Sequence, residues 1–253
     1  MGERPLSPDH AAFARSLVIH ADKALMVFDK PPGLASQGGS GVDLSLDDLM
    51  AAFVTPKGRV PRLIHRLDRE TSGVIIAGRT KPATAELSQA FASRATQKTY
   101  LAIVCGGPVQ APEGMIDQPL HKSTRPGALD LMRPCPPDHP GAQAAITRYK
   151  TLASTPAAAL VAFFPQTGRM HQLRAHAAHI GHPIAGDAKY GGLFSLAGVA
   201  IPRLMLHAAR LSVPHPLGGQ ATYAAPAPAD LIAACEALGL PLANNWHDPA
   251  GEG

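Results

Sequence analysis

The sequence has few of the features that mark membrane-spanning, secreted or disulfide-bonded proteins. No apolar run approaches the roughly 20 residues that a membrane-spanning helix needs, and the opening MGERPLSPDH lacks the basic-then-apolar order of a signal peptide. The three cysteines, Cys105, Cys135 and Cys235, stand far apart without a Cys-x-x-Cys pair, so neither a disulfide framework nor a cysteine zinc site is indicated. We therefore expect a cytoplasmic protein with reduced cysteines and no membrane partner.

The chain also lacks internal repeats and any linker long enough to force a domain boundary. Its 253 residues can bury one large core or two small ones. We predict a single catalytic domain over residues 21–240, preceded by an arm over residues 1–20 and followed by a tail over residues 241–253.

Positive charge is concentrated in two blocks. Residues 56–105 carry 9 basic and 3 acidic side chains and residues 166–210 carry 5 and 1, whereas residues 1–55 and 211–253 are acidic. A folded surface formed from the two blocks would attract a polyanion through phosphate contacts and counterion release. Charge alone leaves a solvated basic face as the alternative.

Short apolar runs bounded by glycine, proline and polar residues predict most of the secondary structure. Strands are predicted at residues 24–29, 73–77, 99–104, 145–152, 160–164, 204–213 and 221–224, and helices at residues 45–53, 81–94, 170–180 and 229–238. Residues 108–140 are rich in proline, glycine and polar residues and are predicted to be irregular. Because strands dominate without regular βαβ alternation, we predict an α+β fold with a mixed, mostly antiparallel central sheet flanked by helices and loops.

One polar stretch places a carboxylate among arginines. Residues 63–73 (LIHRLDRETSG) put Asp68 between Arg66 and Arg69, on a connection between predicted strands. Nearby guanidinium groups favour the ionised form of a carboxyl group. An ordinary buried ion pair is the alternative interpretation of any single aspartate of this kind.

A second polar stretch, residues 166–176 (QTGRMHQLRAH), places Arg174 three residues after His171. This spacing predicts that both lie on one helix face and point into one site. The stretch begins a group of histidines, which raises a zinc hypothesis: His171, His176, His179 and His182. Their spacing is not His-Glu-x-x-His and no carboxylate lies among them, so we expect no metal.

These stretches carry a family resemblance. HRLDRETSG at residues 65–73 matches the His-Arg-Leu-Asp-x-x-Thr-Ser-Gly signature of the RluA-type family of RNA pseudouridine synthases. DKPPGL at residues 29–34, QKTYLA at residues 97–102 and TGRMHQLRAHAAHIGHPIAGDAKYG at residues 167–191 match in the expected order. The chain therefore resembles this family over nearly its whole length.

The resemblance implies roles for individual residues. Asp68 matches the catalytic aspartate, which acts during cleavage of the N-glycosidic bond, rotation of the uracil and re-attachment through carbon 5. Arg174 matches the arginine that forms a salt bridge with that aspartate, and Tyr100 matches the tyrosine that lies against the uracil and is a candidate for removing the proton from carbon 5. Arg66 matches the arginine that enters the RNA stack where the target nucleotide has been flipped out. Further residues of these motifs are expected to contact RNA: Arg69, Lys98, Arg169 and His171.

The chemistry fits a single carboxylate. Hydrolysis of a glycosidic bond usually employs two carboxylates, whereas an isomerisation keeps the uracil in the pocket and uses no water. Asp68 with an arginine partner is then sufficient, and we expect no cofactor. Asp187 is expected to be a turn or supporting residue rather than a catalyst.

Many members of this family carry an N-terminal S4 RNA-binding domain, for which this chain has too few residues, so no S4 domain is expected. Target selection would then rest on the catalytic domain and residues 108–140. The expected substrate is 23S rRNA, with tRNA, or both RNAs, as alternatives. A non-catalytic RNA-binding protein and a metal-dependent hydrolase are the other readings. We expect a monomer with no obligatory protein partner.

Overall fold

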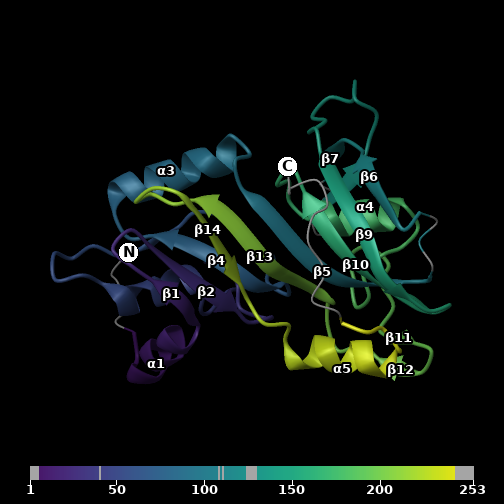
Figure 1. The fold of residues 1–253 in the computed structure, drawn as a ribbon, viewed down its shortest axis with the longest axis horizontal. Helices are drawn as coiled ribbons and strands as arrows, with labels where there is room; N and C mark the ends of the chain where they lie inside the picture. The colour runs from purple at the N-terminus through teal and green to yellow at the C-terminus, as the bar shows by residue number, and fades with distance from the viewer. Residues whose placement is uncertain (1–5, 40, 108, 110, 124–129, 243–253) are drawn as a thin grey trace. The chain divides into compact units, whose positions relative to one another are not determined.

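The computed structural model describes residues 6–39, 41–107, 109, 111–123 and 130–242. The chain divides into two compact units, one made of residues 1–96 and 208–226 and the other of residues 97–207 and 227–253. Both units combine antiparallel strands with short helices (Figure 1). This confirms the predicted α+β class with a mostly antiparallel sheet, while the predicted domain bounds stay a prediction.

The first unit contains strands that are neighbours in the order β1-β2-β4-β13. Their bounds are β1 Val18–Ala21, β2 Leu25–Lys30, β4 Ser72–Gly78 and β13 Leu206–Pro214, with β3 (Arg62–Leu63) paired to β4 and β14 (Gln220–Ala224) paired to β13. β2 and β4 are antiparallel, and Lys30 at the end of β2 lies opposite Gly73 at the start of β4. A Cβ at Gly73 would lie 2.2 Å from the carbonyl oxygen of Ala208, so only glycine fits where β13 approaches.

Local capping signals fix the predicted helices of this unit. Helix α3 (Lys81–Ala92) begins after Thr80, whose side chain accepts a backbone hydrogen bond as its N-cap. A capping box on Ser45 starts α2 (Leu46–Leu49), which continues as a 3-10 turn over Met50–Phe53. Both predicted helices are confirmed, the second in this two-part form.

The residues predicted as an N-terminal arm contain a helix and a strand where the structure describes them, and neither element was predicted. Helix α1 (Pro8–Ser16) follows the N-cap Ser7, and β1 pairs with β2. The helix buries only Ala14, and β1 alternates between half-buried and exposed residues. Neither element therefore has the apolar run or stripe that would reveal it in the sequence.

The apolar run of β4 is buried along its whole length because the strand is covered on both faces. Val74 and Ile76 pack in one cluster with Leu87 of α3. Phe28 of the neighbouring β2 meets the ring of Phe53 edge-on, with the ring centroids 5.5 Å apart. This core supports the end of the sheet at which β4 begins.

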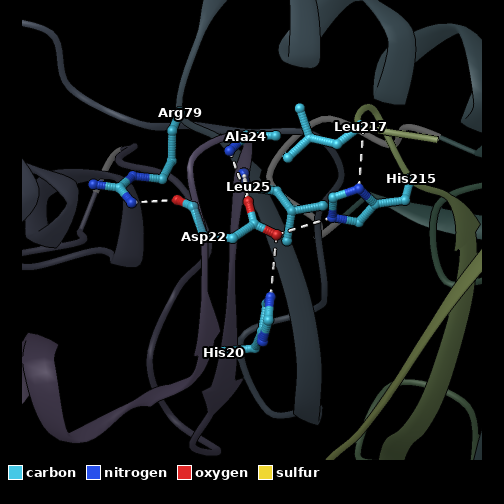
Figure 2. A network of polar contacts seen from close by, with 7 residues as sticks. All are labelled: His20, Asp22, Ala24, Leu25, Arg79, His215 and Leu217. Carbon is cyan, nitrogen blue, oxygen red and sulfur yellow. Dashed lines mark hydrogen bonds and ion pairs between the residues drawn. The ribbon is translucent and has the colours of Figure 1, made fainter.

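A carboxylate joins two turns of the first unit (Figure 2). Asp22, between β1 and β2, accepts hydrogen bonds from two backbone N–H groups of its own turn at 2.7 and 2.9 Å. Its second oxygen contacts Nε2 of His20 at 3.2 Å and Nε2 of His215, which follows β13, at 2.9 Å. Burial raises the pKa of Asp22, but the hydrogen bonds outweigh burial and hold the pKa well below its ordinary value. Asp22 thus ties the β1–β2 turn to the β13–β14 hairpin.

The second unit contains strands in the order β5-β10-β9-β6, each antiparallel to its neighbour. Their bounds are β5 Gln97–Cys105, β10 Ala158–Pro165, β9 Ile146–Ser154 and β6 Glu113–Asp117, with helices α4 (Gln172–His179) and α5 (Ala229–Ala237) and the small hairpin of β11 (Ser195–Leu196) and β12 (Val199–Ala200). Every residue of β10 is buried, and its core includes Leu173 of α4 and Leu231 of α5. Among the residues that the structure describes, no helix is long and apolar enough to cross a membrane.

Residues 108–140 contain three strands where we predicted irregular structure. β6 pairs with β9, and β7 (Leu120–Ser123) pairs with β8 (Leu131–Pro134). Strand β6 buries only Ile116, and strand β8 buries only Met132. Neither strand therefore has an apolar run that would predict it from the sequence. Their stability comes from pairing with a partner strand, which local composition does not reveal.

Candidate active site

Asp68 lies in the segment between β3 and β4 of the first unit, as predicted. The hydroxyl of Ser36 donates to the carbonyl oxygen of Leu67 at 2.8 Å and accepts its N–H at 3.0 Å. The N–H of Thr71 donates to the carbonyl oxygen of Asp68 at 3.1 Å. The half-buried carboxylate therefore projects from a backbone that is held on both sides.

A buried lysine clamps this segment to the turn after β2. Lys30 is fully buried, and its ammonium donates to the carbonyl oxygens of Pro31, Leu34 and Arg69 at 2.9, 2.8 and 3.0 Å. The side chain of Arg69 also joins this segment to the turn, because its Nε donates to the carbonyl oxygen of Gly33 at 2.9 Å. Lys30 was not singled out from the sequence, because a charged residue at the end of an apolar run is normally exposed.

We expect Lys30→Met to lower the free energy of unfolding by about 3 kcal/mol, because three buried carbonyl groups lose their donor. Urea denaturation followed by circular dichroism measures this change. Lys81→Met, which alters an exposed lysine at the start of α3, is the matched control and should change stability little. Equal, small effects of the two substitutions would contradict a clamp.

The segment around Asp68 presents a positive surface. Its exposed basic residues are Lys57, Arg59, Arg62, Arg66 and Arg69. These five residues carry more than half of the 9 basic side chains of residues 56–105. They are exposed to solvent and are not paired with buried acidic residues. The surface beside Asp68 is thus suited to a polyanion.

Lys98 and Tyr100 alternate on β5 of the second unit and therefore face the same side of the strand. Tyr100 is half-buried and lies opposite Phe163 of β10. The Nζ atom of Lys98 lies 3.8 Å from the position that a Cβ of Gly168 would take, so the ammonium rests against the loop before α4. Burial lowers the pKa of Lys98 to about 8. An acceptor oxygen from a bound molecule would stabilise this poorly solvated cation.

Arg174 of α4 forms a buried bidentate ion pair with Asp187. The Nε and Nη2 atoms of the arginine each lie 2.7 Å from a carboxylate oxygen, and the aspartate side chain is completely buried. Asp187 also accepts the N–H groups of Lys189 and Tyr190 at 3.0 and 3.2 Å. It therefore shapes its own turn while it orients the guanidinium, in line with the supporting role expected for it.

His171 does not belong to the helix that was predicted to start at residue 170. Its φ of 50° is left-handed, so α4 begins at Gln172 and His171 is its N-cap. A shared helix face with Arg174 is therefore ruled out, yet the two residues meet the same side chain. Nδ1 of His171 lies 3.0 Å from the hydroxyl of Tyr190, whose ring centroid lies 5.1 Å from the guanidinium carbon of Arg174.

The loop before α4 is fixed by a buried glutamine. Oε1 of Gln172 accepts the hydroxyl of Thr167 at 2.7 Å and the N–H of Arg169 at 3.0 Å. Nε of Arg169 donates to the carbonyl oxygen of Ala144 at 3.1 Å, so this exposed arginine is also anchored to the protein. The RNA contact predicted for it stays a prediction.

Comparisons with known proteins identify the family of the chain. The sequence model of the family described as RNA pseudouridylate synthase matches residues 24–179, more than half of the chain. The chain belongs to this family.

The relatives support the assignment. A Rickettsia bellii protein named ribosomal large subunit pseudouridine synthase C is 40% identical over 177 residues, and a Yersinia pestis protein of the same name is 36% identical over 215 residues. These alignments cover 69% and 84% of this chain but 56% and 65% of the two relatives. The structure of human RNA pseudouridylate synthase domain containing 4 is 28% identical, with a TM-score of 0.79, and the match covers 93% of this chain and 99% of that one.

Membership confirms the predicted resemblance to RNA pseudouridine synthases. The predicted site residues divide between the units: Asp68, Arg66 and Arg69 lie on one segment of the first, whereas Lys98, Tyr100, Arg169, His171 and Arg174 lie in the second. In the second unit, Tyr190 and Asp187 contact these residues, and only the structure reveals those contacts.

The histidines of the family motif serve several purposes. His176 is fully buried, with Nδ1 2.9 Å from the hydroxyl of Thr147 and Nε2 3.0 Å from the carbonyl oxygen of Gln118. His179 is exposed, and Nδ1 of His182 lies 3.2 Å from the carbonyl oxygen of Cys105. Within the described ranges, no three histidine, cysteine or acidic residues are grouped as metal ligands.

The burial of His176 predicts a pH-dependent stability. Burial lowers the pKa of His176 below its ordinary value of 6.5, so the unfolded chain binds the proton more readily than the folded chain does. The stabilisation by neutral His176 is thus complete above the unfolded pKa and is lost as pH falls below it. We expect the urea midpoint to drop between about pH 7.5 and about pH 5.5. This drop should shrink in His176→Gln but not in His179→Gln; equal drops in both variants would contradict the assignment.

Proposed function

We propose that this chain isomerises uridine to pseudouridine in large-subunit ribosomal RNA. The observation that carries the proposal is the family match over residues 24–179, because this range includes Asp68, Tyr100 and Arg174. The relatives named ribosomal large subunit pseudouridine synthase C favour ribosomal RNA over tRNA as the substrate.

In this reaction the bond between carbon 1′ of the ribose and N1 of uracil breaks, and a bond from carbon 1′ to carbon 5 replaces it. Carbon 5 loses its proton, N1 gains one, and no water is consumed. We assign Asp68 to the glycosidic cleavage and Tyr100 to the uracil face, where the phenol would assist removal of the carbon 5 proton. Arg174 is assigned to holding Asp68 ionised. A guanidinium has five N–H donors, so its bidentate pair with Asp187 is compatible with this second carboxylate.

The exposed basic residues before Asp68 support binding of RNA through its phosphates. We expect Arg66→Ala to weaken RNA binding and to reduce the slope of log K against log salt by about 1. Filter binding across a salt series measures both quantities. Arg15→Ala, at an exposed position on α1, is the matched control. An affinity and slope unchanged by Arg66→Ala would remove this residue from the RNA surface.

The proposed activity is tested by release of tritium from RNA that carries tritium at carbon 5 of uridine. Unmodified transcripts of large-subunit ribosomal RNA and of tRNA are incubated separately with the protein. Release from the ribosomal transcript alone is the expected result, and mapping then identifies the modified uridine. Release from tRNA alone would contradict the ribosomal substrate. Binding of both RNAs without release from either would favour a non-catalytic RNA-binding protein.

A further inference from the structure

Tyr190 contacts two of the predicted site residues with different parts of one side chain. It follows the turn shaped by Asp187, in the GDAKYG sequence, and belongs to the second unit like the residues it contacts. The face of its ring lies over the guanidinium of Arg174, 5.1 Å from the guanidinium carbon to the ring centroid. Arg174 is thereby restrained by the carboxylate of Asp187 and by an aromatic ring.

The hydroxyl of Tyr190 makes the second contact. The N–H of Met132 in β8 donates to this oxygen at 2.8 Å, which fixes the tyrosine to the β7–β8 hairpin. The same hydroxyl lies 3.0 Å from Nδ1 of His171, and the two rings meet nearly at right angles, with 88° between their planes. The hydroxyl is therefore placed to share a hydrogen bond with Nδ1 of the imidazole.

The backbone of His171 has an unusual conformation. Its φ of 50° and ψ of 22° are left-handed, which costs a residue with a Cβ about 1 kcal/mol. His171 makes no side-chain capping bond that would account for this conformation. Strained backbone of this kind persists when the surrounding contacts fix it, and such residues cluster at functional sites.

We propose that Tyr190 is a positioning residue for the reaction, its hydroxyl orienting His171 and its ring orienting Arg174 toward the RNA substrate. The proposal rests on the proposed function, because it takes both residues to act on uridine-containing RNA. Independently of catalytic activity, the hydroxyl of Tyr190 sets the tautomer of His171.

Two substitutions separate the two parts of the side chain. Tyr190→Phe removes the hydroxyl and keeps the ring over Arg174, whereas Tyr190→Leu removes both. We expect Tyr190→Phe to lower kcat for tritium release about tenfold with little change in KM, as for one lost hydrogen bond in an active site. Tyr190→Leu should lower kcat about tenfold further than Tyr190→Phe does. The difference between the two variants measures the contribution of the ring.

A double-mutant cycle then tests the route through His171. Tyr190→Phe should have little further effect in a His171→Ala background, because the residue on which the hydroxyl acts is gone. Tyr149→Phe, which removes the hydroxyl of a half-buried tyrosine on β9, is the matched control and should leave kcat unchanged. Urea denaturation of each variant gives the folded fraction by which rates are corrected.

Nitrogen-15 NMR of His171 provides the readout that does not depend on activity. Wild type should show one dominant tautomer of the neutral ring, and Tyr190→Phe should show a mixture. Identical spectra of the two proteins, or effects on kcat that multiply in the double mutant, would overturn the proposal. If wild type releases no tritium while the tautomer changes as expected, the proposed function has failed and the positional claim for Tyr190 stands.

Discussion

Asp68→Asn is expected to release no tritium from uridine-labelled ribosomal RNA under conditions in which wild type releases it to completion. Asparagine keeps the size of the side chain but removes the negative charge that we assign to cleavage of the glycosidic bond. Loss of a group that acts directly on the reacting bond lowers the rate by at least about 10⁴-fold, which corresponds to about 5.5 kcal/mol of transition-state stabilisation.

The structure predicts that this variant folds. The segment around residue 68 is held by backbone contacts of Leu67 and Thr71 and by the Lys30 clamp, none of which uses the carboxylate of Asp68. The variant should therefore remain folded and bind RNA. A loss of activity can then be attributed to the chemistry and not to the fold.

The matched control is Glu70→Gln, which neutralises an exposed carboxylate two residues away on the same segment. It changes the charge of the surface by the same amount and should keep nearly full activity. Turnover by Asp68→Asn at more than about one tenth of the wild-type rate would contradict the assignment of this residue. Equal losses in both variants would indicate an effect of surface charge on RNA binding.

Elements that carry their own signals could be predicted from the sequence. The strand at β4 shows a continuous apolar run, and α3 shows an N-cap at Thr80 followed by a proline in its first turn. Both signals are local, so the chain adopts the predicted structure without help from distant residues. The motif around Asp68 was predictable for the same reason, since its residues are contiguous.

Elements that depend on distant partners could not be predicted in this way. Strand β6 is stabilised by its pairing with β9, in which Met115 lies opposite Arg148. Neither residue predicts a strand from the local sequence. His171, whose backbone is left-handed, contacts the hydroxyl of Tyr190, which lies nineteen residues further along the chain. Local propensity describes one segment at a time, whereas these conformations are decided by contacts between segments.

The same distinction separates the parts of the site. Asp68 and Arg174 were singled out because their motifs match a family signature. Lys30 was not singled out, and the partner of Asp187 was not predicted, because a clamp or an ion pair is defined by the atoms around it. A charged residue that folding buries must be satisfied by several partners at once, so its substitution affects both the fold and the site.

Asp187→Asn is expected to lower both the free energy of unfolding, by about 3 kcal/mol, and the tritium release per folded molecule, by about 10²-fold. The carboxylate is fully buried and balances the charge of Arg174 through two contacts of 2.7 Å. An amide has no charge and offers one acceptor in place of two, so the guanidinium is left poorly compensated in the interior. It would then lose its fixed orientation. Urea denaturation and the tritium assay measure the two effects separately.

Asp230→Asn is the matched control for Asp187→Asn. Asp230 forms a bidentate pair with Arg203 of the same unit, with contacts of 2.6 and 2.7 Å, and neither residue belongs to a catalytic motif. The aspartate side chain is 35% exposed, so its loss should cost less stability, and the activity per folded molecule should not change. If Asp187→Asn loses stability but keeps full activity per folded molecule, the ion pair is structural, and the reaction does not require Arg174 to be paired with Asp187. If activity falls only in Asp187→Asn, the buried aspartate works through the arginine, and the GDAKYG turn belongs to the catalytic machinery.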